Sequence, residues 1–537
     1  MKPSRENRHA GSRLQGGDRR GCVTKPSGCV RDVLPQNQPV PFQVRRNATQ
    51  PIRVLKFGGT SLGDASCIER AAEIIRVNLR ESDVVVVVSA MSGVTNKLFE
   101  AVTCSETGDL EAVATIFERL RKQHTAAANT LIHSAPARSR IRQKMRELFQ
   151  EGERLCRETK IRGEMTLEIR DAIASLGERL SAPLVAAVLT ERGVASEAIE
   201  ATELVVTDSR HGAADPQMEL TRERCEARLH PLLRQHVVPV ITGFIGATPQ
   251  GLITTLGRGG SDYSATILGA ALEADEVAIW TDVDGLLTAD PRLVPDACTI
   301  PEISYREAAD LAHFGAKVLH PKTLRAVTPH GIPVWIRNTF APKKPGTKLT
   351  PSGPPTRGGV TALSAISDVA LISIGPSIMR SPNVLDRALA TAAVIRADVL
   401  LRSQSASHDD IWLVVPSSCA KRTVEALRRE FAQDIAARPL EEICHGGEVA
   451  IVTVVGQNIG GMSGVTERAM EALGCGDVNV LASTQTSLEH NISFVVHRED
   501  MKVALLALHK EFELAARNSQ DEEITSGDLG SPRAAAL

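Results

Sequence analysis

The stretch from Val54 to Ser61, VLKFGGTS, decides the fold of the first half of the chain. An apolar run ends there in a lysine and two glycines, and apolar side chains at helical spacing follow from Ile68 to Leu79. This order predicts a strand, a tight turn and a helix that begins near Ser61. Free amides at a helix N-terminus attract anions, so the turn predicts a phosphate site beside Lys56. The alternative is an ordinary strand-to-helix turn with a solvated lysine.

A second glycine turn, GRGGSD from Gly257 to Asp262, lies further along the chain. The segment before it, Phe244 to Leu256, predicts a hairpin with its turn at Pro249 to Gly251. That hairpin delivers the chain directly into Arg258, a second cation at a glycine turn. Glycine permits positive φ and a close approach of the backbone to a phosphate. Together the two turns favour phosphate chemistry.

The composition is that of a multidomain globular protein. The 537 residues are too many for one ordinary core, and 42% of them are hydrophobic. A net charge of −2 provides no basic field, so we expect no nucleic-acid partner. The longest apolar runs, Val84 to Val88 and Ala182 to Leu189, are far below the roughly 20 residues that cross a bilayer, so we expect no membrane span.

The ten cysteines are scattered, with no CxxC pair, and we find no secretory signal. Reduced thiols in a cytoplasmic protein are therefore expected. His313, His320 and His330 lack metal-ligand spacing and are expected to be structural, so we predict no metal site built by the protein.

Shifts in composition divide the chain into six segments. We expect a basic disordered extension at 1–50, an α/β domain at 51–348, a linker at 349–362, two α+β modules at 363–440 and 445–516, and a disordered tail at 517–537. The extension has almost no periodic apolar residues and cannot contribute to a core. A targeting peptide and an over-called start codon are the alternatives for it.

The α/β domain alternates short apolar strands with helices. Uniformly apolar strands are buried on both faces, which predicts a mostly parallel sheet between helical layers. The expected strands are Ile52 to Phe57, Val84 to Ser89, Val237 to Phe244, Val277 to Thr281 and Val334 to Asn338. From Ser105 to Gly177 the pattern is almost entirely helical and highly charged, and predicts a solvated helical subdomain.

The C-terminal part repeats itself with an offset of about 80 residues. Val369 to Gly375 returns as Val449 to Gly456, and Ile411 to Val415 returns as Ile492 to Val496. Each copy has the predicted order strand, helix, strand, strand, helix. A duplication with a fixed period indicates two like modules.

Polar groups gather at the ends of several apolar strands, where ligands of open α/β sheets bind. Together with the two glycine turns they form the ordered set KFGGTS, SAMSGVTN, GERLSA, GFIG, GRGGSDYSA, WTDVDG, DPR and GAKVLHP. On these motifs, residues 52 to about 515 resemble an aspartate kinase, and the duplicated modules resemble the paired ACT domains of that family.

The resemblance implies the amino-acid-kinase fold, a three-layer sandwich with a mostly parallel sheet, followed by two ferredoxin-like ACT modules. It implies that ATP phosphorylates the side-chain carboxylate of L-aspartate to give 4-phospho-L-aspartate and ADP, the first step towards lysine, threonine and methionine. Mg²⁺ would bridge the ATP phosphates. Because no second enzyme follows the modules in this sequence, we expect a monofunctional kinase.

The resemblance also implies roles for individual residues. The catalytic set would be Lys56, Arg258 and Asp262, and the aspartate-binding set Ser89, Thr95, Glu178 and Arg258. Glu178 would pair with the aspartate ammonium, and Arg258 with a carboxylate. The nucleotide would be bound by Lys56, Gly58, Gly59, Thr60, Gly259, Gly260, Ser261, Thr281, Asp282, Arg292 and Lys317. Leu287 departs from the family, which usually has a tyrosine near the nucleotide base.

Other interpretations of these residues are open. Glu178 and Arg179 would end a helix, where surface ion pairs are common, and Asp282 and Asp284 could merely shape a turn. The rival functions are another amino-acid or nucleoside-monophosphate kinase of the same fold, and an amino-acid sensor with a degenerate kinase half. The sensor predicts loss of a catalytic residue, yet Lys56 and its partners are present.

The modules predict regulation by an amino acid, with threonine preferred over lysine. Gln404 and Gln485 occupy equivalent places and resemble the glutamines of threonine-sensitive aspartate kinases. An amide can donate to and accept from a hydroxyl, whereas a lysine pocket would need a carboxylate. Gly461 and Gly464 belong to a glycine-rich loop that could hold the effector carboxylate.

The first module has the run Met379 to Asn383 in place of that loop, and its proline removes an amide donor. We expect a homodimer or higher homo-oligomer formed through the modules. The alternative is that both glutamines are ordinary exposed strand residues and that the modules serve only to dimerise the enzyme.

Overall fold

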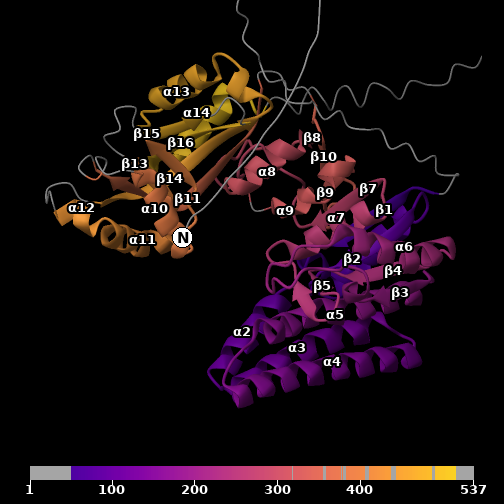
Figure 1. Cartoon of the computed structure of the whole chain (residues 1–537). Helices are drawn as coiled ribbons and strands as arrows, with labels where there is room; N and C mark the ends of the chain where they lie inside the picture. The colour runs from indigo at the N-terminus through magenta and orange to yellow at the C-terminus, as the bar shows by residue number, and fades with distance from the viewer. Residues whose placement is uncertain are drawn as a thin grey trace, which may run out of the picture. The chain divides into compact units, whose positions relative to one another are not determined.

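The structure is a computed structural model of the whole chain. It divides into residues 1–49 and 50–537, and all of the described residues belong to the second unit. The described residues are 50–316, 318–354, 359–375, 378, 383–404, 411–436, 443–485 and 490–515. The predicted N-terminal extension, except for Gln50, and the predicted tail lie outside them. Figure 1 shows the order of the helices and strands along the chain.

The first part of this unit is built on a sheet that has eight strands in the described residues, in the order β3-β4-β2-β1-β7-β9-β10-β8. All neighbours are parallel except β9 and β10. The bounds are β1 Ile52–Phe57, β2 Asp83–Val88, β3 Ser196–Ile199, β4 Val238–Thr242, β7 Glu276–Thr281, β8 Glu302–Ser304, β9 Val334–Asn338 and β10 Thr347–Thr350. The predicted mostly parallel sheet is confirmed.

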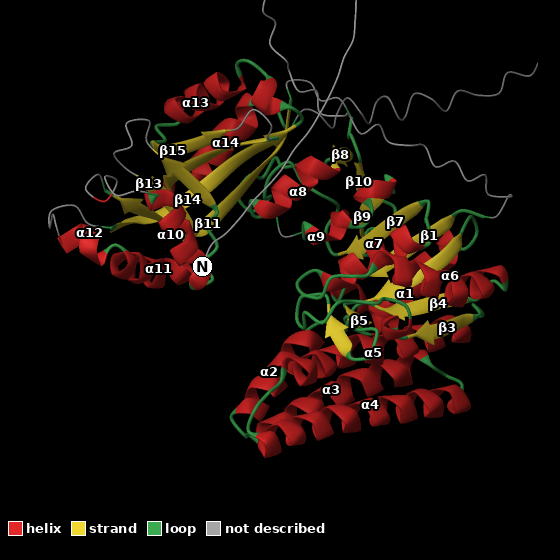
Figure 2. Ribbon diagram, in the orientation of Figure 1, coloured by secondary structure: helices red, strands yellow, loops and turns green. Residues whose placement is uncertain are grey.

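Helices cover both faces of this sheet, which makes the predicted three-layer sandwich (Figure 2). Side chains alternate along each strand, so Leu55 packs into one apolar core while Val54 packs into the other. The first core is completed by α1 Ala65–Asn78, α2 Val94–Glu106, α3 Leu110–Leu131, α4 Ala135–Arg162 and α5 Leu167–Glu191. The second is completed by α6 Met218–Arg234, α7 Gly260–Ala271, α8 Tyr305–His313 and α9 Lys322–Arg325.

Helix α5 is long and apolar enough to cross a membrane by length and composition, but 78% of its most apolar window is buried inside the protein. It is therefore the central helix of the first core. The prediction that Glu178 and Arg179 end a helix is wrong, because both lie inside α5. The preceding Gly177 allows a close approach, since a Cβ there would lie 2.6 Å from Cβ of Ala90.

The predicted hairpin is confirmed as β5 Ile245–Ala247 and β6 Ile253–Thr255, which pair antiparallel. Gly251 in its turn has a φ of +85°. Further on, β10 runs to Thr350 and β11 begins at Val360, so both ends of the predicted linker are strands.

The two C-terminal modules share one antiparallel sheet, in the order β12-β13-β11-β14-β16-β15 among the described residues. The first copy is β11 Val360–Ile374, α10 Val384–Val394, β12 Leu401–Gln404, β13 Ile411–Pro416 and α11 Ser417–Glu430, followed by α12 Ala432–Ala436. The second is β14 Cys444–Gly456, α13 Val465–Cys475, β15 Val480–Gln485, β16 Asn491–His497 and α14 Met501–Glu511. The predicted order of elements is found in both copies.

Candidate active site

A cavity of about 790 Å³ lies where β1, β2 and β7 end. The carboxyl ends of neighbouring parallel strands meet at one edge of a sheet, which is where ligands of such folds bind. The predicted site residues that line the cavity are Lys56, Gly58, Gly59, Thr60, Ser89, Thr95, Glu178, Arg258, Gly259, Gly260, Ser261, Asp262, Thr281 and Asp282. Both glycine turns therefore face the same space.

Lys56 is buried at the end of β1 and faces the start of α7. Its Nζ lies 2.6 Å from Oδ1 of Asp262, and the two side chains are 8% and 16% exposed. Both residues also line the cavity. The ion pair therefore holds the ammonium of Lys56 in the cavity wall.

The first glycine turn differs from the predicted strand-to-helix turn. A short 3-10 helix, Thr60–Leu62, follows it, and α1 begins only at Ala65, so the prediction of a helix that begins near Ser61 is wrong. Asp64 is the reason, because its side chain caps α1 by accepting from the amide of Cys67 at 2.9 Å.

The second glycine of this turn, Gly59, serves close approach rather than positive φ. Gly59 has a φ of −60°, but a Cβ there would lie only 3.1 Å from the carbonyl oxygen of Ala90. The second turn behaves differently, since Gly259 has a φ of +70° and α7 begins directly after it at Gly260. The N-terminus of α7 is therefore the helix start that faces the cavity.

Glu178 is a buried carboxyl group in the cavity wall, 3% exposed. Its Oε1 accepts from the amide of Ala90 at 3.1 Å, and Oε2 has no hydrogen-bond partner among the described residues. Burial raises the pKa of Glu178 to about 8, although the Ala90 amide and the charge of Lys56 oppose the shift. Such a group is suited to a cationic partner that restores its charge.

Arg258 lies between two glycines with positive φ, Gly257 at +80° and Gly259 at +70°. Its side chain is exposed and lines the cavity, and among the described residues we find no hydrogen bond or ion pair to its guanidinium. His320 packs against the turn, since a Cβ on Gly259 would lie 2.6 Å from Cβ of His320. The guanidinium is thus available to a carboxylate.

Beyond the end of β7, polar side chains surround Asp284. Its carboxylate accepts from Asn338 Nδ2 at 2.6 Å and from Lys344 Nζ at 2.7 Å, and these partners lower the pKa of Asp284. Neither Asn338 nor Lys344 was predicted from the sequence. Asp284 thus contacts distant parts of the chain and does not line the cavity, whereas Asp282 is exposed and lines it.

Two predicted nucleotide-side residues are not placed in the cavity. Arg292 is 83% exposed, pairs with Asp290 at 2.6 Å, and does not line the cavity. Lys317 lies outside the described residues. The cavity also has lining residues that no motif indicated, namely Phe99, Arg170, Asp171, Gly212 and Thr255, while Phe244 comes from the GFIG motif.

In the C-terminal modules, Gln485 ends β15 and is exposed. Its Oε1 accepts from the hydroxyl of Thr466 at 2.6 Å, in the first turn of α13. Gly464, which precedes that helix, has a φ of +87°, and Gly461 belongs to the short 3-10 helix before it. Gln404 ends β12 at the equivalent place, but its side chain and the run 379–382 lie outside the described residues.

Comparison with known proteins shows which families the chain resembles. The family model described as the amino acid kinase family matches residues 51–338, and one described as an ACT domain matches residues 452–512. Aspartokinase 1, chloroplastic, of Arabidopsis thaliana is 32% identical over 86% of this chain and 80% of its own length. The bifunctional aspartokinase/homoserine dehydrogenase of Daucus carota is also 32% identical, and this chain spans about half of its length.

Two solved structures have the same fold. Escherichia coli aspartokinase III, in complex with lysine and aspartate in its T-state, has a TM-score of 0.72 and 29% identity over 86% of this chain and 99% of its own. The aspartate kinase of Clostridium acetobutylicum has a TM-score of 0.71 at 24% identity, over 86% of this chain and 100% of its own. The amino acid kinase family model matches more than half of the chain, and Aspartokinase 1 of Arabidopsis thaliana is 32% identical and covered over 80% of its length, so this chain belongs to the aspartokinases of the amino acid kinase family.

Proposed function

We propose that this chain is an aspartate kinase, which transfers the γ-phosphoryl group of ATP to the side-chain carboxylate of L-aspartate to form 4-phospho-L-aspartate and ADP. The observation that carries the proposal is that Glu178 and Arg258 line the same cavity. Glu178 has a buried oxygen without a hydrogen-bond partner among the described residues, and the guanidinium of Arg258 is free there to bind a ligand. An amino-acid zwitterion presents an ammonium and a carboxylate that match them. The Escherichia coli structures with aspartate and with ADP support the same assignment.

In the proposed reaction, Glu178 holds the aspartate ammonium and Arg258 one carboxylate, with Ser89 and Thr95 in the same wall. An oxygen of the side-chain carboxylate forms a bond to the γ-phosphorus as the bond from that phosphorus to the bridging oxygen of ADP breaks. The carboxylate is already ionised, so no general base is needed. Lys56, oriented by Asp262, neutralises charge on the transferring group.

On the nucleotide side, the backbone of Gly58, Gly59 and Thr60 and the start of α7 would cradle the phosphates. Mg²⁺, when bound with ATP, supplies further neutralisation of the phosphates. Among the described residues we find no group of three or more His, Cys, Asp or Glu side chains that could hold a metal ion. Mg²⁺ needs no such group, because it is usually held by one or two carboxylates and by phosphate oxygens. Asp282 is an exposed carboxylate in the wall that could serve.

An ATP-dependent hydroxamate assay with aspartate, glutamate and homoserine tests the reaction. Aspartate should give the acyl hydroxamate, while homoserine, which has no side-chain carboxylate, should give none. Equal activity with glutamate would favour another amino-acid kinase of this fold. An Asp262→Asn variant is the control for a contaminating kinase, because it should lose most of the signal.

The C-terminal modules are proposed to bind an amino-acid effector, with threonine as the first candidate and lysine as the alternative. Because Oε1 of Gln485 accepts from Thr466, the amide NH₂ of Gln485 remains a donor for an effector hydroxyl. The lysine bound to Escherichia coli aspartokinase III supports the alternative. Inhibition requires that the effector binds a less active arrangement more tightly than the active one.

We also propose that the protein is a cytoplasmic homodimer or higher homo-oligomer. One apolar cluster on the C-terminal sheet consists of strand residues, such as Val369, Val414 and Val495, together with Phe314. The described helices of the modules contribute no residue to this cluster. Partly buried Leu371 and Leu401 extend this face, and a second copy could cover it. Light scattering at micromolar concentration tests this, since a monomer would contradict it.

A further inference from the structure

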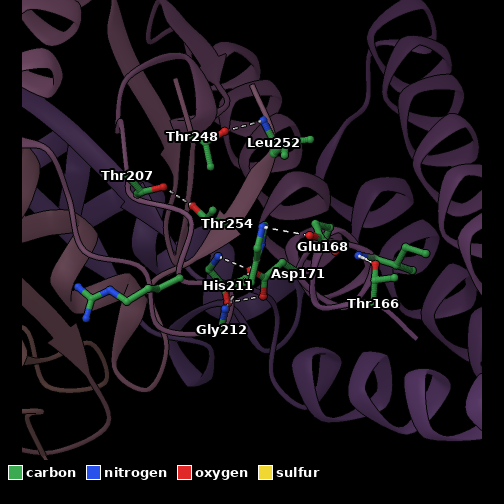
Figure 3. Close-up of polar contacts among 12 residues, drawn as sticks. Thr166, Glu168, Asp171, Thr207, His211, Gly212, Thr248, Leu252 and Thr254 are labelled. Carbon is green, nitrogen blue, oxygen red and sulfur yellow. Dashed lines mark hydrogen bonds and ion pairs between the residues drawn. The ribbon is translucent and has the colours of Figure 1, made fainter. Parts of the chain in front are cut away.

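Asp171 places a buried carboxylate in the cavity wall with both oxygens used by protein donors (Figure 3). It lies near the start of α5 and is 3% exposed. Oδ2 accepts from Nδ1 of His211 at 2.9 Å and from the amides of Gly212 and Thr255, each at 3.0 Å. Oδ1 accepts from the hydroxyl of Thr255 at 2.7 Å. Since a carboxylate only accepts, Nδ1 of His211 carries the hydrogen.

These donors come from two segments that Asp171 joins. One is the loop formed by residues 208–216, called the 208–216 loop, and the other is strand β6. The loop closes on itself, because Oδ1 of Asp208 accepts from the amide of Asp215 at 3.1 Å. It also contacts β6 directly, since the amide of Ala214 donates to the carbonyl of Thr255 at 3.0 Å. Three elements therefore meet at one carboxylate.

This junction lies immediately before Arg258. From Thr255 the chain runs through Leu256 into Gly257, which has a φ of +80°. A Cβ on Gly257 would lie 3.0 Å from the carbonyl oxygen of Gly212, so the 208–216 loop and the chain leading to Arg258 pack in backbone contact. A shift of that loop would therefore displace the backbone at Gly257 and, with it, Arg258.

We propose that Asp171 is a positioning residue, whose carboxylate fixes the 208–216 loop and β6 so that the guanidinium of Arg258 is held where the substrate carboxylate binds. The proposal rests on the proposed function, which assigns that carboxylate to aspartate. Asp171 acts through Arg258, because both of its oxygens already accept from protein donors and its side chain is buried. Its loss should weaken aspartate binding and leave the nucleotide side unchanged.

The same hairpin offers a matched control. Thr254, next to Thr255 in β6, points to the opposite face of the strand and shares a 2.6 Å hydrogen bond with the hydroxyl of Thr207. Thr254 and Thr207 are both fully buried. Figure 3 shows this pair of threonines apart from the carboxylate of Asp171. Thr254→Val removes a buried hydrogen bond from β6 without touching the junction, whereas Thr255→Val removes the bond to Oδ1 and keeps the backbone amide.

The test measures KM for aspartate, KM for ATP and the thermal midpoint of the full chain and its variants. We expect Asp171→Asn to raise the aspartate KM about tenfold or more, with the ATP KM within about twofold. Thr255→Val should also raise the aspartate KM, by about threefold. Thr254→Val should lower the midpoint but change the aspartate KM by less than about twofold.

His211 provides a rescue that does not depend on Asp171→Asn folding. His211→Ala removes a donor and should raise the aspartate KM, whereas His211→Asn places an amide N–H near the position of Nδ1 and should restore it. An unchanged aspartate KM in Asp171→Asn or Thr255→Val, or an equal rise in Thr254→Val, would overturn the proposal. A wild-type chain inactive towards aspartate would instead overturn the proposed function, and this inference with it.

Discussion

Nζ of Lys56 and Oδ1 of Asp262 lie 2.6 Å apart, so the lysine at the end of β1 and the carboxylate in the first turn of α7 form one ion pair. The two glycine turns are distant in sequence, but this pair joins them at the cavity. Because both side chains are largely removed from water, the loss of either leaves the other buried and unpaired. The two turns therefore act as a single unit.

Lys56→Ala should fold but lose nearly all turnover. The charge on the transferring phosphoryl group is needed mainly in the transition state, so kcat should fall about 10²- to 10³-fold, equivalent to ~2.7–4 kcal/mol. Steady-state kinetics and circular dichroism on the same preparation check this. Turnover within about threefold of wild type would exclude the role.

Arg258→Ala should mainly raise the KM for aspartate and leave that for ATP nearly unchanged. Arg258→Lys should restore aspartate binding only poorly, because an ammonium cannot reproduce the two parallel hydrogen bonds of a guanidinium to a carboxylate. Varying each substrate at saturation of the other separates the two constants. A change in the ATP constant alone would show that the two sides of the site have been assigned wrongly.

Glu178 should make aspartate binding depend on pH. Its pKa of about 8 means that the empty site holds a neutral carboxyl near neutrality, yet an ammonium needs the ionised form. The aspartate KM should therefore fall as pH rises towards 8, by up to about tenfold per pH unit. Glu178→Gln cannot ionise, so its aspartate KM should be high and nearly flat over the same range.

The same shift has a consequence for stability. Between its ordinary value of 4.5 and about 8, the carboxyl of Glu178 binds more protons folded than unfolded, so it favours the folded state less as pH rises. Glu178→Gln should therefore gain stability relative to wild type between acid pH and pH 8. Thermal melts of the ligand-free proteins across that range measure the difference, and parallel curves would contradict the buried, neutral carboxyl.

Threonine and lysine, titrated separately against kinase activity, should show inhibition by threonine. Gln485→Ala should weaken the response, because it removes the amide donor while leaving α13 intact. Thr466→Val is a useful companion, since it removes only the hydroxyl that holds Oε1 of Gln485. Lysine inhibition without a threonine effect would exclude the assignment, and a threonine response untouched by Gln485→Ala would place the site elsewhere.

Much of the fold could be predicted because buried parallel strands leave a strong apolar signal. The strands predicted at Ile52, Val84 and Val277 are found. The first has its predicted bounds, the second is shifted by one residue at both ends, and the third begins one residue earlier. β3, Ser196–Ile199, was missed because it is short and half polar. The helix end predicted at Glu178 and Arg179 was wrong, because a sequence does not show whether a neighbouring glycine, here Gly177, turns the chain or admits a neighbour such as Ala90.

The residues of the candidate site also fall into those that could be predicted from the sequence and those that could not. Lys56 and Asp262 could be predicted, since each belongs to a short motif next to a glycine turn. Asp171 could not, because its donors lie in a loop and a strand with no local motif, and only the tertiary fold brings them together. The start of α1 at Ala65 was missed because the capping role of Asp64 was not recognised.

The pairing of β11 with β14 also bears on how the C-terminal part folds. These strands are the first elements of the two modules, and each has its own module's hairpin strand on the other side. A chain cut between the modules would leave the long β11 with an open edge, a template for aggregation. The pairing also joins segments far apart in sequence, which slows folding. The two modules should therefore unfold in one cooperative transition, and neither copy alone should behave as a separable domain.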